Sequence, residues 1–406
     1  MDEQEAITKA QALLNRPGDA NVSPLAVYRH AAKADSVQQR RPNVVLIMME
    51  SMSAKFMKHF GQSETLTPFL DSLYTRSISF RNFYSAGIHT NHGLYATLYS
   101  FPAMMKRNLM KGSVIPRYSG LPTVLKENGY YNLFFMTHEG QYDNMNAFFR
   151  TNGYDEVFSQ EDYPVDKVVN SFGVQDDFLY DYAIPVLNQR AATGQPFFAT
   201  LLSISNHPPY VIPPFFHPKT SEPEMQIVEY ADWALRQFFE EARKQPWFDN
   251  TIFVLEGDHG KLVGDAECEL PKSYNHIPLM IYSSRIQPEE KTAFGGQVDI
   301  QPTILGLLNI DYLQNNFGVD LLKEERPCMF YTADNMVVGR NDTLLYLYNY
   351  ETQQELTYDI GNGKLNAVPM DDSFFPLKEY SFSMLQSAEF LVKHGKTLNS
   401  IPFTQQ

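Results

Sequence analysis

The chain has 406 residues, of which 43% are hydrophobic and 20% charged, so it can bury a large core and does not have the composition of a disordered protein. The net charge is −14 and no dense run of Lys or Arg occurs, which excludes the basic face that nucleic-acid binding requires. No run of 18 apolar residues is present, so no segment of this sequence is expected to span a bilayer.

The two cysteines, Cys268 and Cys328, lie far apart and form no CxxC pair, which excludes a thiolate zinc site. We expect free thiols, and pairing in an oxidising compartment stays open.

Residues 1–40 predict a helical lead-in. Ile7, Ala10 and Leu14 have helical spacing, and Pro17-Gly18 interrupts the pattern. A second helix is predicted over 24–34, followed by a polar linker.

The pattern changes at residue 43, where seven consecutive residues without charge predict a strand buried on both faces. Similar strands are predicted further along the chain, with helical patterns between them. The strands are expected at 78–84, 131–136, 197–204, 251–255 and 278–282, and the helices at 67–76, 94–100, 121–128, 176–190 and 222–244. This alternation predicts an α/β fold with a doubly wound, mostly parallel central sheet flanked by helices.

The last part of the chain has a different pattern. Residues 343–348 and 355–358 predict a β-hairpin, and a helix is expected at 377–393. We therefore expect a lead-in over 1–40, a catalytic domain over 41–324, and an α+β subdomain over 325–406 with a small antiparallel sheet and one helix.

Ligands of open α/β sheets bind beyond the carboxyl ends of the strands. Glu50 directly follows the first buried strand, and Asp258 and His259 follow the strand at 251–255 inside a glycine-flanked turn. A carboxylate and an imidazole in such a turn can face one cation. Taken singly, Glu50 can be a solvated strand-end acid and Asp258 part of an ordinary turn.

Thr90 lies between a predicted strand and a predicted helix, in the segment Gly87-Ile88-His89-Thr90-Asn91. At a helix N-terminus, backbone N–H groups point toward whatever the hydroxyl binds. An ordinary helix cap is the alternative for this residue.

These segments occur in an order that resembles the sulfatase/alkaline-phosphatase superfamily, and within it the lipoteichoic acid synthase-like branch. The resemblance covers about 41–310 and also includes Thr67-Pro68-Phe69-Leu70-Asp71 and the stretch from Gln297 to Thr303. It implies an alkaline-phosphatase-like fold and a single divalent ion, typically manganese, with zinc, magnesium or calcium as alternatives. Matched motif by motif, the ligands would be Glu50, Thr90, Asp258 and His259, with Thr90 as nucleophile.

The resemblance also implies substrate-binding positions after two further strands. His138 and His207 match family histidines near the substrate phosphate, and Asn91 and Arg150 are the other candidates. His89, His92 and His276 lie near these motifs, and we interpret them as structural.

The run Thr90-Asn91-His92-Gly93 lacks the Pro and Arg that follow the nucleophile in sulfatases, and threonine cannot give their formylglycine. Sulfate-ester hydrolysis is therefore disfavoured. We expect transfer of a phosphoglycerol or related phosphate-containing lipid headgroup through phospho-Thr90. Two alternatives stay open: an ester hydrolase or phosphodiesterase that uses water, and a catalytically degenerate member that binds an anion.

Members of this branch usually carry transmembrane helices before the catalytic domain. The expectation is an extracytoplasmic fragment of a bacterial membrane enzyme, acting in the periplasm or at the outer face of the inner membrane. Met1-Asp2-Glu3-Gln4-Glu5 is unlike the basic start of a signal peptide.

Overall fold

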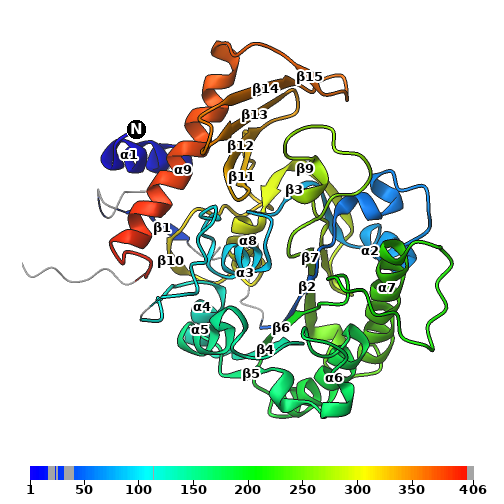
Figure 1. The fold of residues 1–406 in the computed structure, drawn as a ribbon. Helices are drawn as coiled ribbons and strands as arrows, with labels where there is room; N and C mark the ends of the chain where they lie inside the picture. Colours follow the sequence, from blue (N-terminus) through cyan, green and yellow to red (C-terminus); the bar gives the residue numbers. More distant parts are fainter. Residues whose placement is uncertain (17–22, 24–25, 32–40, 113, 400–406) are drawn as a thin grey trace, which may run out of the picture.

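The computed structural model describes residues 1–16, 23, 26–31, 41–112 and 114–399, arranged around one large sheet (Figure 1). This sheet has eight strands in the order β5-β4-β6-β2-β7-β8-β3-β9. Only β8 runs against its neighbours, so the predicted mostly parallel sheet is confirmed. The strands are β2 (Asn43–Met49), β3 (Ile78–Tyr84), β4 (Tyr131–Met136), β5 (Glu156–Phe158), β6 (Phe197–Leu202), β7 (Thr251–Gly257), β8 (Leu279–Tyr282) and β9 (Glu289–Gly296).

Helices cover both faces of this sheet, as Figure 1 shows. Alternate residues of β2 face opposite layers, with Val45 and Ile47 in one apolar cluster and Val44 and Leu46 in the other. This is why β2 is a continuous apolar run and not an alternating one. The first layer contains α2 (Pro68–Tyr74), α6 (Asp176–Ala192) and α7 (Pro223–Ala242); the second contains α3 (Thr90–Tyr99), α4 (Leu121–Glu127), α5 (Met145–Thr151) and α8 (Ile300–Leu307).

Short 3₁₀ turns connect many of these elements. They are η1 (Ala54–Phe56), η2 (Lys58–Phe60), η3 (Tyr142–Asn144), η4 (Gln160–Asp162), η5 (Val165–Lys167), η6 (Phe248–Asn250), η7 (Lys272–Tyr274), η8 (Gln297–Asp299) and η9 (Asp372–Phe374).

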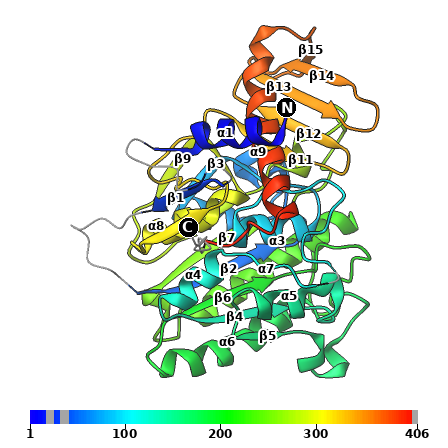
Figure 2. The ribbon, with the colours of Figure 1, turned by 90° about the vertical axis from the view of Figure 1, so that its left-hand side faces the viewer.

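The C-terminal part forms a separate antiparallel sheet with α9 (Phe375–Lys393) packed on it (Figure 2). The predicted hairpin and helix are confirmed, and three further strands extend the sheet. Its strands are β11 (Met329–Thr332), β12 (Met336–Arg340), β13 (Leu344–Asn349), β14 (Glu355–Asp359) and β15 (Asn366–Ala367). Neither Cys268 nor Cys328 forms a disulfide.

The N-terminal segment packs on this C-terminal part. Helix α1 (Glu3–Leu14) confirms the first predicted helix and lies against α9 (Figure 2), where Lys393 Nζ is 3.0 Å from Glu3 Oε1. Among the described residues, no helix has both the length and the apolar character needed to cross a bilayer.

The second predicted helix, over 24–34, is wrong where the structure describes it. Residues Tyr28–Ala31 form strand β1, which pairs antiparallel with β10 (Tyr312–Asn315). The rest of that prediction and the polar linker to residue 40 lie outside the described residues. Pairing with β10 and burial of Arg29 override the local helical pattern.

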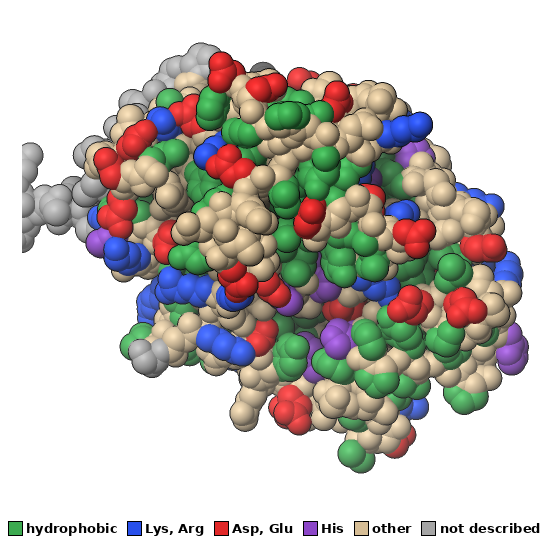
Figure 3. Space-filling view, turned by 45° about the horizontal axis from the view of Figure 1, so that its top comes forward, with side chains coloured by type: hydrophobic (Ala, Val, Ile, Leu, Met, Phe, Trp, Pro, Cys, Tyr) green, Lys and Arg blue, Asp and Glu red, His purple; other side chains and the backbone are tan. Residues whose placement is uncertain are grey.

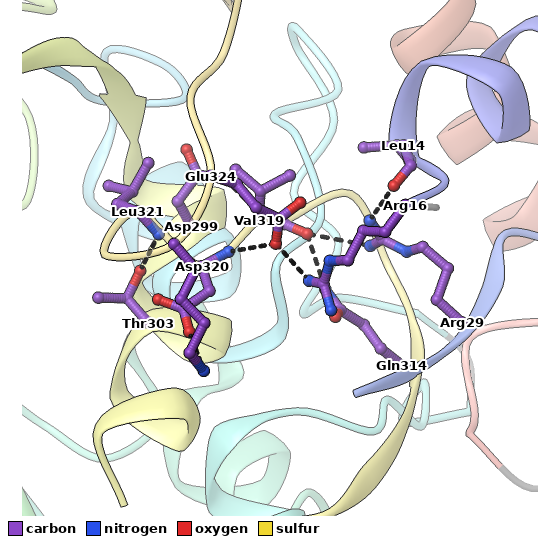
Figure 4. Close-up of polar contacts among 12 residues, drawn as sticks. Leu14, Arg16, Arg29, Asp299, Thr303, Gln314, Val319, Asp320, Leu321 and Glu324 are labelled. Carbon is purple, nitrogen blue, oxygen red and sulfur yellow. Dashed lines mark hydrogen bonds and ion pairs between the residues drawn. The ribbon is translucent and has the colours of Figure 1, made fainter. Parts of the chain in front are cut away.

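Arg29 is fully buried and donates to three backbone carbonyls, those of Leu14, Asn316 and Gly318. Figure 4 shows Arg29 between the end of α1 and the segment that carries Gln314 and Val319. The guanidinium therefore ties the N-terminal segment to the chain that follows α8.

Candidate functional site

The site begins where two neighbouring parallel strands end. Met49 of β2 pairs with Gly257 of β7, so Glu50 and Asp258 follow at the same edge of the sheet. Both carboxylates are inaccessible to solvent. The backbone N–H of Ser51 donates to Asp258 Oδ1 at 2.8 Å, and the Ser51 hydroxyl donates to Glu50 Oε1 at 2.7 Å.

His259 completes a group of three potential metal ligands. Its Nε2 lies 3.8 Å from Glu50 Oε1 and 3.6 Å from Asp258 Oδ2, and one ligand atom of each residue lies within 4.8 Å of the others. The His259 Nδ1 faces the Gly260 carbonyl at 2.7 Å. A proton on Nδ1 therefore leaves the Nε2 lone pair directed at the carboxylates.

Thr90 contacts this group from α3. Its Oγ1 donates to Glu50 Oε2 at 3.4 Å, and it is the first residue of the helix, preceded by the N-cap His89. The structure thus brings together the four residues that the sequence nominated as ligands, although they span more than half of the chain.

The donors in this group fit a divalent cation. Asp258 Oδ2 is buried and has no hydrogen-bond partner among the described residues. Burial, and next the neighbouring Asp258, raise the pKa of Glu50 well above its usual value. The Glu50 and Asp258 carboxylates are buried, with ligand atoms within 4.8 Å of one another, so a positive charge between them would stabilise both. Carboxylate, hydroxyl and imidazole donors are compatible with manganese, and also with magnesium or zinc.

Helix α3 lies very close to the turn after β7, and Gly93 and Gln297 make this possible. A Cβ atom on Gly93 would lie 2.2 Å from the Asp258 carbonyl oxygen, so only glycine fits there. The side chain of Gln297 donates to the carbonyls of Gly257 and Asp258 and accepts from the N–H of Ala86. The loop before α3 and the turn after β7 are therefore held to one another.

The two predicted substrate histidines follow the next two strands of the sheet. The order β4-β6-β2-β7 places their carboxyl ends side by side, with His138 after β4 and His207 after β6. His138 is buried, which lowers its pKa, and its Nδ1 lies 3.1 Å from the Glu139 carbonyl. His207 is half-buried, with Nδ1 2.6 Å from the Pro208 carbonyl and its ring 4.0 Å from that of Phe172.

In the view of Figure 3, His side chains gather around a hollow in the surface, with acidic side chains beside them.

Asn91 and Arg150, the other predicted substrate contacts, differ in position. Asn91 Nδ2 is 3.4 Å from Asp143 Oδ2, and its buried Oδ1 has no partner among the described residues. Arg150 instead donates to Asn146 Oδ1 and to the Val157 carbonyl. Among the described contacts, none links Arg150 to the metal-ligand group.

Two of the three other histidines near the motifs have polar partners, and the third is buried. His89 Nε2 lies 2.6 Å from Asp334, and His276 Nε2 lies 2.8 Å from the Arg81 carbonyl. His92 is buried beneath Gly87, and burial lowers its pKa to about 3.

Lys261, which directly follows Gly260, was not predicted from the sequence as a site residue. Its Nζ donates to Asn206 Oδ1 at 2.8 Å and to the Tyr210 hydroxyl at 3.0 Å. Burial lowers the pKa of Lys261 to about 8. The only sequence signal was its position two residues after His259.

The fold and these strand-end residues define a known class of protein. The sulfatase family model matches residues 42–310, and the chain therefore belongs to the sulfatase family. Its α/β architecture is alkaline-phosphatase-like, as expected from the resemblance. A solved protein of the alkaline phosphatase superfamily from Vibrio parahaemolyticus is 26% identical, with a TM-score of 0.85 over 97% of both chains.

The similar curated proteins belong to a narrower group of enzymes than the family as a whole. Lipoteichoic acid synthase 2 of Bacillus subtilis is 24% identical over 70% of this chain, and phosphoglycerol transferase I of Xanthomonas campestris is 26% identical over 75%. The chain spans about half the length of these relatives, 47% and 46% respectively. The structure of lipoteichoic acid synthase LtaP from Listeria monocytogenes shares the fold, with a TM-score of 0.77 and 20% identity over 96% of this chain and 98% of that one.

Proposed function

We propose that this protein is a metal-dependent phosphoryl-group transferase that moves phosphoglycerol or a related headgroup through a covalent phospho-Thr90 intermediate. The observation that carries the proposal is the convergence of Glu50, Thr90, Asp258 and His259 at the carboxyl ends of β2 and β7. The similarity to lipoteichoic acid synthases and a phosphoglycerol transferase supports the choice of headgroup.

In the proposed first step, Thr90 Oγ1 attacks the phosphorus, and the bond from phosphorus to the lipid oxygen breaks. A divalent ion held by Glu50, Asp258, His259 and Thr90 would supply positive charge that favours the alkoxide and the anionic phosphoryl group. Glu50 Oε2, to which the Thr90 hydroxyl donates, takes the hydroxyl proton in the first step and returns it to Thr90 Oγ1 when the acceptor displaces it in the second. Free N–H groups in the first turn of α3 favour negative charge at Thr90.

His207 supplies the other proton transfers of the proposed reaction. With Nδ1–H of His207 donated to the Pro208 carbonyl, Nε2 is free to exchange protons. Protonated His207 donates to the leaving oxygen, and neutral His207 then accepts the proton of the acceptor hydroxyl, which attacks phospho-Thr90. Burial lowers the pKa of His138 and so favours its neutral form, which suits a substrate-positioning role. Asn91, which follows Thr90 at the start of α3, is the other proposed substrate contact.

We place this reaction at the outer face of the bacterial inner membrane, where lipid headgroups are available. The similarity to lipoteichoic acid synthases supports this location. Manganese is the proposed ion.

The test uses the manganese-loaded protein with phosphatidylglycerol in mixed micelles. We expect a phosphoglyceryl adduct on Thr90 by intact mass and peptide mapping. Thr90→Ala should form no adduct and lose at least ~10³-fold in rate, as when a nucleophile is removed. Thr75→Ala, an exposed threonine at the end of α2, serves as the matched control.

Full metal-dependent turnover by Thr90→Ala would overturn the nucleophile assignment. Added glycerol as acceptor separates the two reactions: transfer gives the diester diglycerol phosphate, whereas hydrolysis releases the monoester glycerol phosphate. Absence of both the adduct and turnover would favour an anion-binding member without catalysis.

A further inference from the structure

Lys261 is a half-buried cation that has no anionic partner among the described residues. Its Nζ contacts two neutral oxygens, those of the Asn206 amide and the Tyr210 hydroxyl. No carboxylate lies within ion-pair distance of it in the part of the chain that the structure describes. An ammonium group has three protons to donate, so one remains for a further acceptor.

The groups around this ammonium are mostly aromatic and neutral. Nζ lies 4.7 Å from the centre of the Tyr210 ring and 5.4 Å from that of Phe56. Glu224 reaches it only through the Tyr210 hydroxyl, which is 3.4 Å from Glu224 Oε1. Of the ligand group, Glu50 acts on it at longer range. A charge in such surroundings is stabilised when an anion binds to it.

Hydrogen bonds fix Lys261 relative to the proposed reaction site. Its partner Asn206 donates to the Ser51 carbonyl at 3.1 Å, and Ser51 in turn bonds to both Glu50 and Asp258. Asn206 also immediately precedes His207. Lys261 is thereby held between the metal-ligand group and the turn that carries the substrate histidine.

We infer that Lys261 is a substrate-binding residue that donates to a non-bridging oxygen of the transferred phosphoryl group. The identity of the group rests on the proposed function. Lys261 suits this role because it lies beside several carboxylates. These repel an anionic substrate, so a positive charge in addition to the ion favours its approach. A charge-assisted hydrogen bond to phosphate is the strong form of this contact.

The test measures binding of inorganic phosphate to the manganese-loaded protein by isothermal titration calorimetry, which requires no turnover. Lys261→Met should weaken phosphate binding about 10- to 100-fold, and Lys261→Arg should stay within about threefold of wild type. Lys58→Met, at an exposed lysine of η2, is the matched control. The manganese affinity of Lys261→Met should match that of wild type.

Tyr210→Phe distinguishes a ligand role from a structural one. It removes one partner of the ammonium but keeps the charge, so phosphate binding should stay within about threefold of wild type. Equal losses in Tyr210→Phe and Lys261→Met, unchanged binding in Lys261→Met, or no phosphate binding by wild type would each overturn the inference. If phospho-Thr90 never forms but Lys261→Met still weakens phosphate binding, only the proposed function fails.

Discussion

Buried carboxylates in this protein differ in their partners. Glu50 and Asp258 face one another and His259, an arrangement suited to a cation. Asp232 of α7 instead accepts from the backbone N–H groups of Phe69 and Leu70, both at 2.9 Å, at the start of α2. Burial raises the pKa of Asp232 to about 7 even so.

Asp232 should make stability depend on pH. Its folded pKa of about 7 exceeds the usual value near 4, so between these values the folded protein holds a proton that the unfolded chain has lost. Stability from this group therefore falls as pH rises from about 4 to 7. Asp232→Asn should flatten the slope by up to about 1.4 kcal/mol per pH unit.

Urea unfolding at pH 5, 6 and 7 measures this slope. Asp249→Asn, at an exposed position, should leave the slope as in wild type. An unchanged slope in Asp232→Asn would show that Asp232 does not titrate in this range.

At the residue scale, the sequence could nominate Glu50 and Asp258 because each directly follows a buried apolar strand, and His259 because it is the next residue after Asp258. It could not identify Lys261, whose partners lie on the turn after β6, more than 50 positions away. Arg150 was nominated by proximity along the chain, and its observed contacts are with Asn146 and Val157.

At the scale of elements, the position of α3 depends on the close contact of a glycine in the helix with the backbone of the turn after β7. Gly93 lets the first turn of α3 rest on the carbonyl of Asp258, which keeps Thr90 within reach of Glu50. The apolar residues around α3 bury the rest of the helix against the sheet.

Gly93→Ala should displace α3 because the new methyl group would lie 2.2 Å from the Asp258 oxygen. Under the proposed function, a shift of about 1 Å at Thr90 can lower the rate about 10²-fold, while overpacking costs about 1–3 kcal/mol of stability. The rate of Thr90 adduct formation and the urea midpoint measure the two effects.

Ala96→Gly in the same helix is the control, since it costs about 1 kcal/mol of helix propensity without a clash. It should lower stability but keep most of the rate. Equal rates in the two variants would mean that contact at Gly93 does not position Thr90.

Strands buried on both faces were the elements best predicted, because such a strand is a continuous apolar run whichever strands it pairs with. The direction of β8 could not be predicted, since an apolar run does not record which way a strand points. Strand β1 was predicted as helix because its pairing with β10, nearly 300 positions away, leaves no local pattern.

At the scale of the whole molecule, the chain's first segment is fastened to residues far along the sequence. α1 lies against α9, and β1 pairs with β10. Arg29 donates to the Leu14 carbonyl in the first segment and to the carbonyls of Asn316 and Gly318 after β10. Burial lowers the pKa of Arg29 to about 10, and its charge is offset by the carbonyl dipoles that surround it.

Arg29→Met should destabilise the protein by about 3 kcal/mol or more, because three buried carbonyls lose their donor. Urea unfolding measures the loss, with the exposed Arg236→Met as control. Activity per folded molecule should not change. A midpoint equal to that of Arg236→Met would mean that Arg29 is not needed for this attachment.

The contacts of Gln297 have a consequence for how such proteins diversify. Gln297 braces the turn of Asp258 and the loop before α3 from inside the core, and neither brace involves the loops after β4 and β6. The loop after β6 is tied to the metal-ligand group through the bond from Asn206 to the Ser51 carbonyl. The loop after β4 is therefore the one that can accept insertions or new side chains while Glu50, Thr90, Asp258 and His259 keep their spacing. Grafting this loop from a relative is therefore a practical way to test for altered substrate selectivity under the proposed function.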